Sequence, residues 1–289
     1  MRAPLLCLLL AVPLLRAAPA KGTKFTVRTT QFGQTVEHTT YFQGDRLRME
    51  YQNYEGPNAG PHLAMIMRCD LGQIFELNLD ANRYDSAPFP PKPYTKEQIA
   101  ALKIPTPLPM PKQKTLRIET TTVDTRERKQ MFGQTARHVI TTTKDIPLSG
   151  KPVPTRVTVE DGWYIDFDPE LSCQPKPSGN VHGFLETLDG NTPPPNPEFV
   201  DIGKPERGFA LWKSYSSDFT TTFADGTTKQ DSTKFKIEVV EFHQGPLDPS
   251  LFEIPGRFRQ VAHIHEGPPP VTQTQSSWDR FIARISSYF

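Results

Sequence analysis

The sequence has few cysteines, almost no net charge and no apolar run long enough for a membrane helix. Its 289 residues include 33 Lys+Arg and 32 Asp+Glu, which gives a formal net charge of +1. Without a basic surplus there is no electrostatic reason to expect nucleic acid as a partner. Hydrophobic residues make up 36% of the chain, which excludes a helical membrane protein with several spans.

Sequence motifs that identify an enzymatic reaction are also missing. The chain contains no G-x-S-x-G elbow, phosphate-binding loop, dinucleotide fingerprint, H-E-x-x-H or C-x-x-C. We therefore predict that the protein is not an enzyme, with no catalytic residues and no cofactor.

Two small groups of potential metal ligands remain. His263 and His265 lie two residues apart, and so do Asp166 and Asp168, so each pair would share one face of a strand. The histidines resemble the start of a metal site, and the carboxylates would suit a calcium site or a hydrolase. Neither group has the three or four converging ligands that a site needs, and we predict no metal.

Residues 1–20 have the layout of a secretory signal peptide. A short basic start precedes an apolar run from Pro4 to Leu15, and Ala18-Pro19-Ala20 supplies the small residues of a cleavage site. The run is shorter than the ~20 residues that a spanning helix needs, so we predict no transmembrane span. The predicted location is periplasmic or secreted.

Cysteine is scarce in the rest of the chain. Cys7 lies inside the apolar run, which leaves Cys69 and Cys173 after cleavage. In an exported protein these two can form a single intramolecular bridge. Two buried, unpaired thiols are the alternative, because sequence alone gives no distance between them.

Apolar and polar residues alternate over most of the remaining sequence, which predicts a mainly β fold of antiparallel strands with one buried face. Residues 62–67 carry apolar side chains on both faces of the expected strand, so both faces should be covered. Turn signals separate the runs, among them Gly44-Asp45, Asp70-Leu71-Gly72 and Asp161-Gly162. We expect about ten strands.

Two short helices are predicted outside the strands. Thr95 opens a capping box that leads into residues 99–102, and residues 277–287 carry an amphipathic stripe. The 30 prolines, roughly double the usual share, gather in loops and in the tail. We divide the mature chain into a β domain over residues 21–262 and a proline-rich tail with the C-terminal helix over residues 263–289.

One short pattern occurs twice. Phe32-Gly33-Gln34-Thr35 with His38 matches Phe132-Gly133-Gln134-Thr135 with His138. The two copies are either turn-plus-strand units of duplicated hairpins or a coincidence in a threonine-rich β protein.

An antiparallel sheet has an apolar face that must be covered, and two short helices are too few for this task. The sheet must therefore pack on itself or curve around an apolar cleft. For the second case we predict cleft walls from inward-facing strand residues, namely Phe75, Leu77, Ile118, Ile165 and Ile237.

Several turn and strand motifs support a family resemblance. These are Gly44 to Glu50, Asp80 to Tyr84, Phe132 to Arg137, Asp161 to Tyr164 and Leu247 to Pro255. Over most of residues 23–262 the chain resembles exported bacterial proteins of domain of unknown function 4412, and more distantly the LolA-like lipoprotein carriers. The resemblance implies an open, strongly curved half-barrel with one or two short helices on its concave side, where such carriers hold acyl chains.

These observations favour an exported, non-enzymatic binding protein. Its ligand would be a lipid, an acyl chain or another apolar small molecule, and its role the handling of envelope lipids or lipoproteins. A structural or interaction module of the cell envelope, which binds a protein partner and no small ligand, is the alternative.

Overall fold

The computed structural model describes most of residues 21–264. It covers residues 21–55, 58–90, 95, 109, 111–148, 154–167, 171–173, 195–223 and 226–264. The predicted signal peptide, the helices predicted at 99–102 and 277–287, Asp168 and His265 lie outside these ranges.

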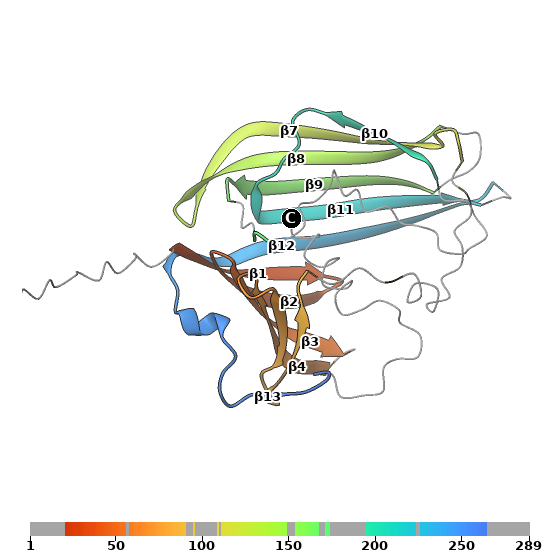
Figure 1. Cartoon of the computed structure of the whole chain (residues 1–289). Coiled ribbons are helices and arrows are strands. Elements are labelled where there is room, and N and C mark those ends of the chain that lie inside the picture. Colours follow the sequence, from red (N-terminus) through yellow and green to blue (C-terminus); the bar gives the residue numbers. More distant parts are fainter. Residues whose placement is uncertain are drawn as a thin grey trace, which may run out of the picture.

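Thirteen strands form one sheet (Figure 1). They are β1 (Lys21–Gln31), β2 (Gln34–Gln43), β3 (Arg46–Glu55), β4 (Asn58–Arg68), β5 (Gln73–Asn78), β6 (Arg83–Pro88), β7 (Leu116–Met131), β8 (Gln134–Pro147), β9 (Thr155–Ile165), β10 (Pro197–Ile202), β11 (Phe209–Thr222), β12 (Thr228–Pro246) and β13 (Arg259–Gln260).

The strand order is β10-β7-β8-β9-β11-β12-β1-β2-β3-β4-β5-β6-β13, so the sheet has two ends and is not closed. Pairing is antiparallel except between β10 and β7 and between β13 and β6. The prediction of a mainly β, antiparallel, curved and open sheet is confirmed. In the described part of the chain the only helical element is η1 (Pro249–Phe252), a short 3₁₀ turn, so the helices expected on the sheet find no support there.

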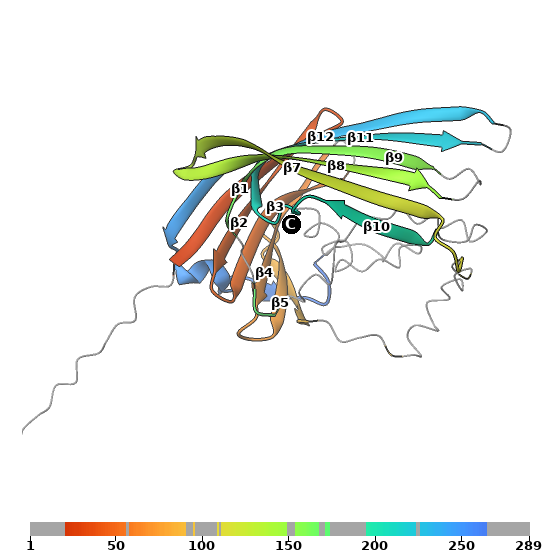
Figure 2. The ribbon, with the colours of Figure 1, turned by 90° about the horizontal axis from the view of Figure 1, so that it is seen from above.

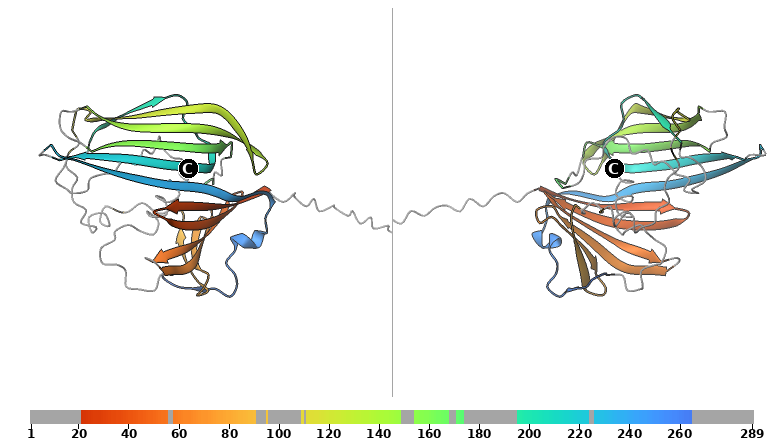
Figure 3. Two further views of the ribbon diagram at one scale, coloured as in Figure 1. Left: turned by 180° about the vertical axis from the view of Figure 1, so that it is seen from behind. Right: turned by 45° about the vertical axis from the view of Figure 1, so that its right-hand side comes forward.

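Most of the sheet consists of two meanders, in which successive strands are neighbours, except that β10 follows β9 in the chain but pairs with β7 at the edge of the sheet. One runs from β1 to β6, and the other through β7, β8, β9, β11 and β12. Pairing of β12 with β1 joins the two meanders. Seen from above, their strands run in clearly different directions (Figure 2), and the views from behind and from the side show a sheet that continues across this junction (Figure 3).

The repeated F-G-Q-T pattern forms the first hairpin of each meander. Phe32 and Gly33 connect β1 to β2, and Phe132 and Gly133 connect β7 to β8. All four residues have positive φ, between 48° and 76°, as the two-residue type I′ turn requires. Both copies are therefore turn-plus-strand units.

At β4 the first meander is buried on both of its faces. Ladder partners share a face, which places Val27, Met49 and Met65 on one side, here called the Met face. Arg28, Arg48 and Ile66 lie on the opposite side, here called the Arg face. From Leu63 to Met67 no side chain is more than 3% exposed, which confirms the expectation of a strand covered on both sides.

The D-P-S-L-F-E-I-P stretch covers the Arg face. Asp248 caps η1 by accepting a hydrogen bond from the backbone of Ser250, and Phe252 (1% exposed) packs against Ile66 and Leu77. Two buried guanidinium groups hydrogen-bond to the backbone of this segment. Arg48 donates to the carbonyl of Leu251 at 3.0 Å, and Arg68 donates to that of Phe252 at 3.3 Å.

One expected turn is a strand interior instead. Asp161-Gly162 lies within β9, whose ladder with β11 continues through both residues. A Cβ atom at position 162 would lie 2.6 Å from the ring of Tyr164, so Gly162 leaves space for that ring. The glycine marks a close side-chain approach and not a chain reversal.

Candidate ligand-binding cleft

The five residues predicted to line one cleft lie in different parts of the sheet. Phe75 and Leu77 face Phe252 beneath the D-P-S-L-F-E-I-P stretch, whereas Ile165 and Ile237 belong to a core cluster around Phe25 and Val27. Ile118 lies on β7, beside the β10 edge. Phe75 is half-buried and the other four are at most 6% exposed. The five therefore do not share a single surface.

Five phenylalanines gather where the two meanders meet. Phe209 lies 4.9 Å from Phe25 and 5.4 Å from Phe167, measured between ring centroids, and Phe167 lies 5.5 Å from Phe242. Phe132, at the tip of the β7–β8 hairpin, approaches Phe242 at 6.3 Å. These edge-on and tilted contacts form an aromatic cluster with Phe167 at its margin.

A cleft of about 630 Å³ opens beside this margin. Strands β7 and β8, the chain that leaves β9, and the loop of residues 203–208 between β10 and β11 enclose it. Phe167, Val139 and Pro205 supply its apolar surface. Its charged side chains are those of Asp124, Arg137, Asp166, Lys204, Glu206 and Arg207.

An ion-pair network anchors the loop to the sheet. Arg137 on β8 donates to both carboxylate oxygens of Glu206, at 2.7 and 2.5 Å, and to Asp166 at 2.6 Å. The backbone N–H groups of Arg207 and Gly208 also donate to Glu206. Burial acts to raise the pKa of Glu206, but these hydrogen bonds and the charge of Arg137 outweigh it, and the pKa is lowered. The hydrogen bond to Glu206 is the main reason that the pKa of Arg137 is raised.

Asp124, on the β7 side of the cleft, is paired with residues of its own strand. Arg128 donates to both of its oxygens, at 2.9 and 2.8 Å, and the backbone of Arg126 donates to it as well. Chiefly because of the hydrogen bond from Arg128, the pKa of Asp124 falls to about 2. Lys204 and Arg207 are exposed and have no ion pair among the residues that the structure describes.

The loop that completes the cleft was not found by sequence reasoning. Residues 204–208 read Lys-Pro-Glu-Arg-Gly and have no periodicity, so they resemble any polar connection. The pairing of Glu206 with Arg137 has no local sequence signal either, because Arg137 stands among polar residues such as Thr135 and His138.

A second hollow of about 430 Å³ lies over β2, β3 and β4. It is lined by His38, Glu37, Glu50, Gln52 and His62, and is mostly polar. His62 lies 3.3 Å from Asp80. With few apolar walls it suits an apolar ligand less well than the first cleft.

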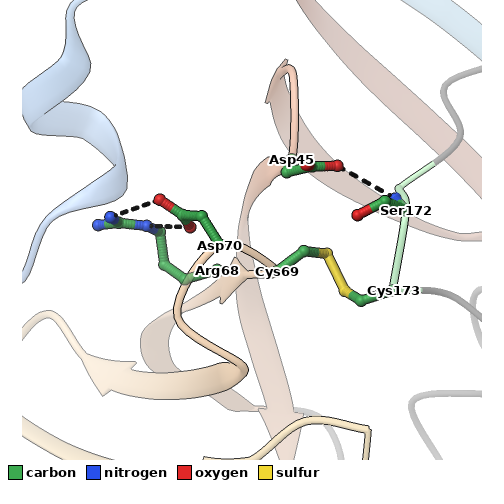
Figure 4. Close-up of a disulfide and its surroundings, with 6 residues drawn as sticks. All are labelled: Asp45, Arg68, Cys69, Asp70, Ser172 and Cys173. Atoms are coloured by element: carbon green, nitrogen blue, oxygen red, sulfur yellow. Dashed lines mark hydrogen bonds and ion pairs between the residues drawn. A yellow bond between two sulfur atoms is a disulfide. The ribbon is translucent and has the colours of Figure 1, made fainter.

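Cys69 and Cys173 form a disulfide, with their Cα atoms 5.4 Å apart (Figure 4). The bridge ties the turn after β4 to a segment that is 104 residues further along the chain. Next to it, Asp45 accepts a hydrogen bond from the backbone of Ser172 at 3.2 Å. Leu171 (3% exposed) packs on the Met face with Met67, so this segment covers part of that face.

The other residues that the sequence suggested as metal ligands or catalytic groups form no such site in the described part of the chain. Asp166 pairs with Arg137, as described above, and His263 is exposed. Within the described ranges no three His, Cys, Asp or Glu side chains are grouped so that they could hold a metal ion. Among the described residues, no helix is long and apolar enough to cross a membrane.

Comparison with known proteins shows no family for this chain. No protein-family model matches it, and no curated protein matches its sequence. Among solved structures, the chain is similar to a DUF1329 family protein from Desulfovibrio piger ATCC 29098, with 11% sequence identity. The match covers 81% of this chain and 90% of that chain, with a TM-score of 0.14. At this score the similarity carries no argument about function, and the resemblance to domain of unknown function 4412 and to LolA-like carriers stays a prediction.

Proposed function

We propose that this chain is an exported binding protein that holds an apolar ligand, such as an acyl chain, in the cleft beside Phe167. The cleft between the sheet and the 203–208 loop carries this proposal. Its volume of about 630 Å³ falls within the range of small-molecule sites, roughly 300–1,000 Å³. Phe167 and Val139 form its apolar wall, and Phe167 also belongs to the aromatic cluster.

The disulfide supports export. Structural disulfides form and persist in oxidising compartments, and they are rare in the cytosol. Cys69 and Cys173 are the only cysteines that follow the predicted signal peptide, and they are paired. An exported binding protein is consistent with both observations.

A binding assay with a neutral probe tests the function. Purified protein, without the signal peptide and with the disulfide formed, is titrated with a long-chain alcohol that carries a terminal dansyl group. We expect saturable binding with an increase of dansyl fluorescence. In the Phe167→Ser variant the apolar wall is lost, and affinity should fall about tenfold, as expected for the loss of more than 1 kcal/mol of apolar contact.

Phe223→Ser is the matched control, because Phe223 is 48% exposed and does not line the cleft. Its affinity should equal that of the unchanged protein. Urea midpoints of both variants would show that they are folded. Absence of saturable binding by the unchanged protein, or equal affinity of the Phe167→Ser variant, would overturn the proposal and favour the protein-interaction alternative.

A further inference from the structure

We infer that the ligand of this cleft is an amphiphile whose head is anionic, a carboxylate or a phosphate, and that Lys204 and Arg207 bind that head. This inference rests on the proposed function, because it names the chemical class of ligand for the same cleft. It follows from the charges around the cleft, from the rigidity of the loop and from the apolar wall.

The charges of the cleft are equal in number but unevenly paired, with three carboxylates and three cations among the lining residues. Arg137 alone pairs with both Glu206 and Asp166, with contacts of 2.5 to 2.7 Å. Asp124 is matched by Arg128. Lys204 and Arg207 then remain as two cations with no carboxylate partner in the described part of the chain. Both line the same cleft, so an anionic group bound there would pair with them.

The loop holds these two cations in place. Gly203 has φ of 88° and packs so closely on the backbone carbonyl of Thr122 that no side chain fits there. At the centre of the loop, Glu206 is held by Arg137 and by two backbone N–H groups, as described above. Lys204 and Arg207 lie between or next to these anchors. Their backbones are therefore fixed before a ligand arrives, which lowers the entropy that binding costs.

Cations beside an apolar wall suit a molecule with two parts. An acyl chain can lie against Phe167 and Val139 while its head reaches the loop. A guanidinium group binds carboxylate or phosphate through two parallel hydrogen bonds, and an ammonium group adds a point charge. A neutral head group would leave both cations without a partner, so the cleft should distinguish an acid from the alcohol of equal length.

The experiment compares two probes that differ only in the head group. The protein with its disulfide formed is titrated with a dansyl-labelled long-chain carboxylic acid and with the corresponding alcohol. We expect the acid to bind about tenfold or more tightly, as charge-assisted hydrogen bonds would give. In the Lys204→Gln/Arg207→Gln double variant this preference should disappear, so that acid and alcohol bind with equal affinity.

Lys234→Gln is the control, because Lys234 is exposed on β12 and does not line the cleft. It should keep the full preference for the acid. A single-chain phosphate monoester, used as a competitor against the carboxylic acid, distinguishes the two anionic heads, and tighter binding of either one supports the inference.

The outcomes separate the two proposals. Equal affinity for acid and alcohol would overturn the anionic head and leave the proposed function intact. An unchanged preference in the double variant would overturn the role of Lys204 and Arg207. Failure of both probes to bind would overturn the proposed function itself.

Discussion

The imidazole of His138 stacks on the indole of Trp163, with ring centroids 4.8 Å apart and planes 14° from parallel. Both ring nitrogens face carboxylates: Nε2 lies 2.7 Å from Asp161, and Nδ1 lies 3.1 Å from Glu127. Glu127 belongs to the irregular stretch of β7 in which the register with β8 shifts. His138 thus connects this irregular stretch to β9 through side-chain contacts.

Replacing this histidine should weaken the second meander. The His138→Ala variant loses the ring stack, the hydrogen bond with Asp161 and the contact with Glu127. We expect the free energy of unfolding to fall by about 1–2 kcal/mol, which is typical of losing one aromatic pair and a partly buried hydrogen bond. Urea denaturation measures this change. His263→Ala is the control, because His263 is exposed, and equal urea midpoints for the two variants would contradict the role of His138.

The disulfide predicts a redox-dependent stability. Reduction frees a loop of 104 residues and releases the cover that Leu171 gives to the Met face. We expect the free energy of unfolding to fall by about 2–4 kcal/mol, the usual effect of removing one native bridge. The measurement is urea denaturation with and without dithiothreitol. A Cys69→Ser/Cys173→Ser variant should match the reduced protein and ignore the reductant; a reductant effect of similar size on that variant would show another cause.

The Arg137–Glu206 pair predicts a dependence of stability on pH. The pKa of Glu206 is lowered in the folded protein from its ordinary value of 4.5. Its contribution is therefore complete above this ordinary value and is lost as the pH falls through the lowered one. The Glu206→Gln variant mimics the protonated acid, so the unchanged protein should be more stable near neutral pH, and the difference should vanish in acid.

Urea denaturation of both proteins between about pH 2 and 7 measures this difference. Glu119→Gln serves as the control, since Glu119 lies on β7 away from the cleft, and its difference from the unchanged protein should vary little over the same range. If the stability difference of Glu206→Gln were constant with pH, the pair would not make the contribution inferred from the structure.

Local alternation was enough to predict the strands, but not what covers them. Residues 62–67 were expected to be buried on both sides, and Leu63 to Met67 are, whereas His62 is exposed. The covers are Phe252 on the Arg face and Leu171 on the Met face, which come from distant parts of the chain. Periodicity reports which side chains share a face, and it contains no information about a segment that arrives from elsewhere. Alternation therefore predicts a cleft at Phe75 and Leu77, although Phe252 packs against them.

The candidate cleft was harder to predict for the same reason. Its wall combines a strand residue, Arg137, with the loop residue Glu206, which lies 69 positions further along the chain. The pairing follows from the order of β8, β9 and β11 in the sheet, which no local pattern specifies. Gly162 shows a different kind of error. Asp161-Gly162 resembles a turn in the sequence, but the glycine lies within β9 and leaves space for the ring of Tyr164.

The repeated F-G-Q-T turns allow a matched test of backbone strain. Phe32 and Phe132 have φ of 48° and 50°, in the left-handed region that asparagine tolerates better than phenylalanine. Phe32 is 78% exposed. Phe132 is 41% exposed and lies 6.3 Å from the ring of Phe242. The two turns thus have the same backbone conformation, but only Phe132 contributes to the aromatic cluster.

Phe32→Asn should therefore raise the free energy of unfolding by about 0.5–1 kcal/mol, because asparagine adopts the left-handed backbone conformation at lower cost and little packing is lost. Phe132→Asn gains the same relief but loses its contact with Phe242, so its stability should stay unchanged or fall. Thermal and urea denaturation of both variants measure the difference. If Phe132→Asn were stabilised as much as Phe32→Asn, the tip of the β7–β8 hairpin would add nothing to the aromatic cluster beside the cleft.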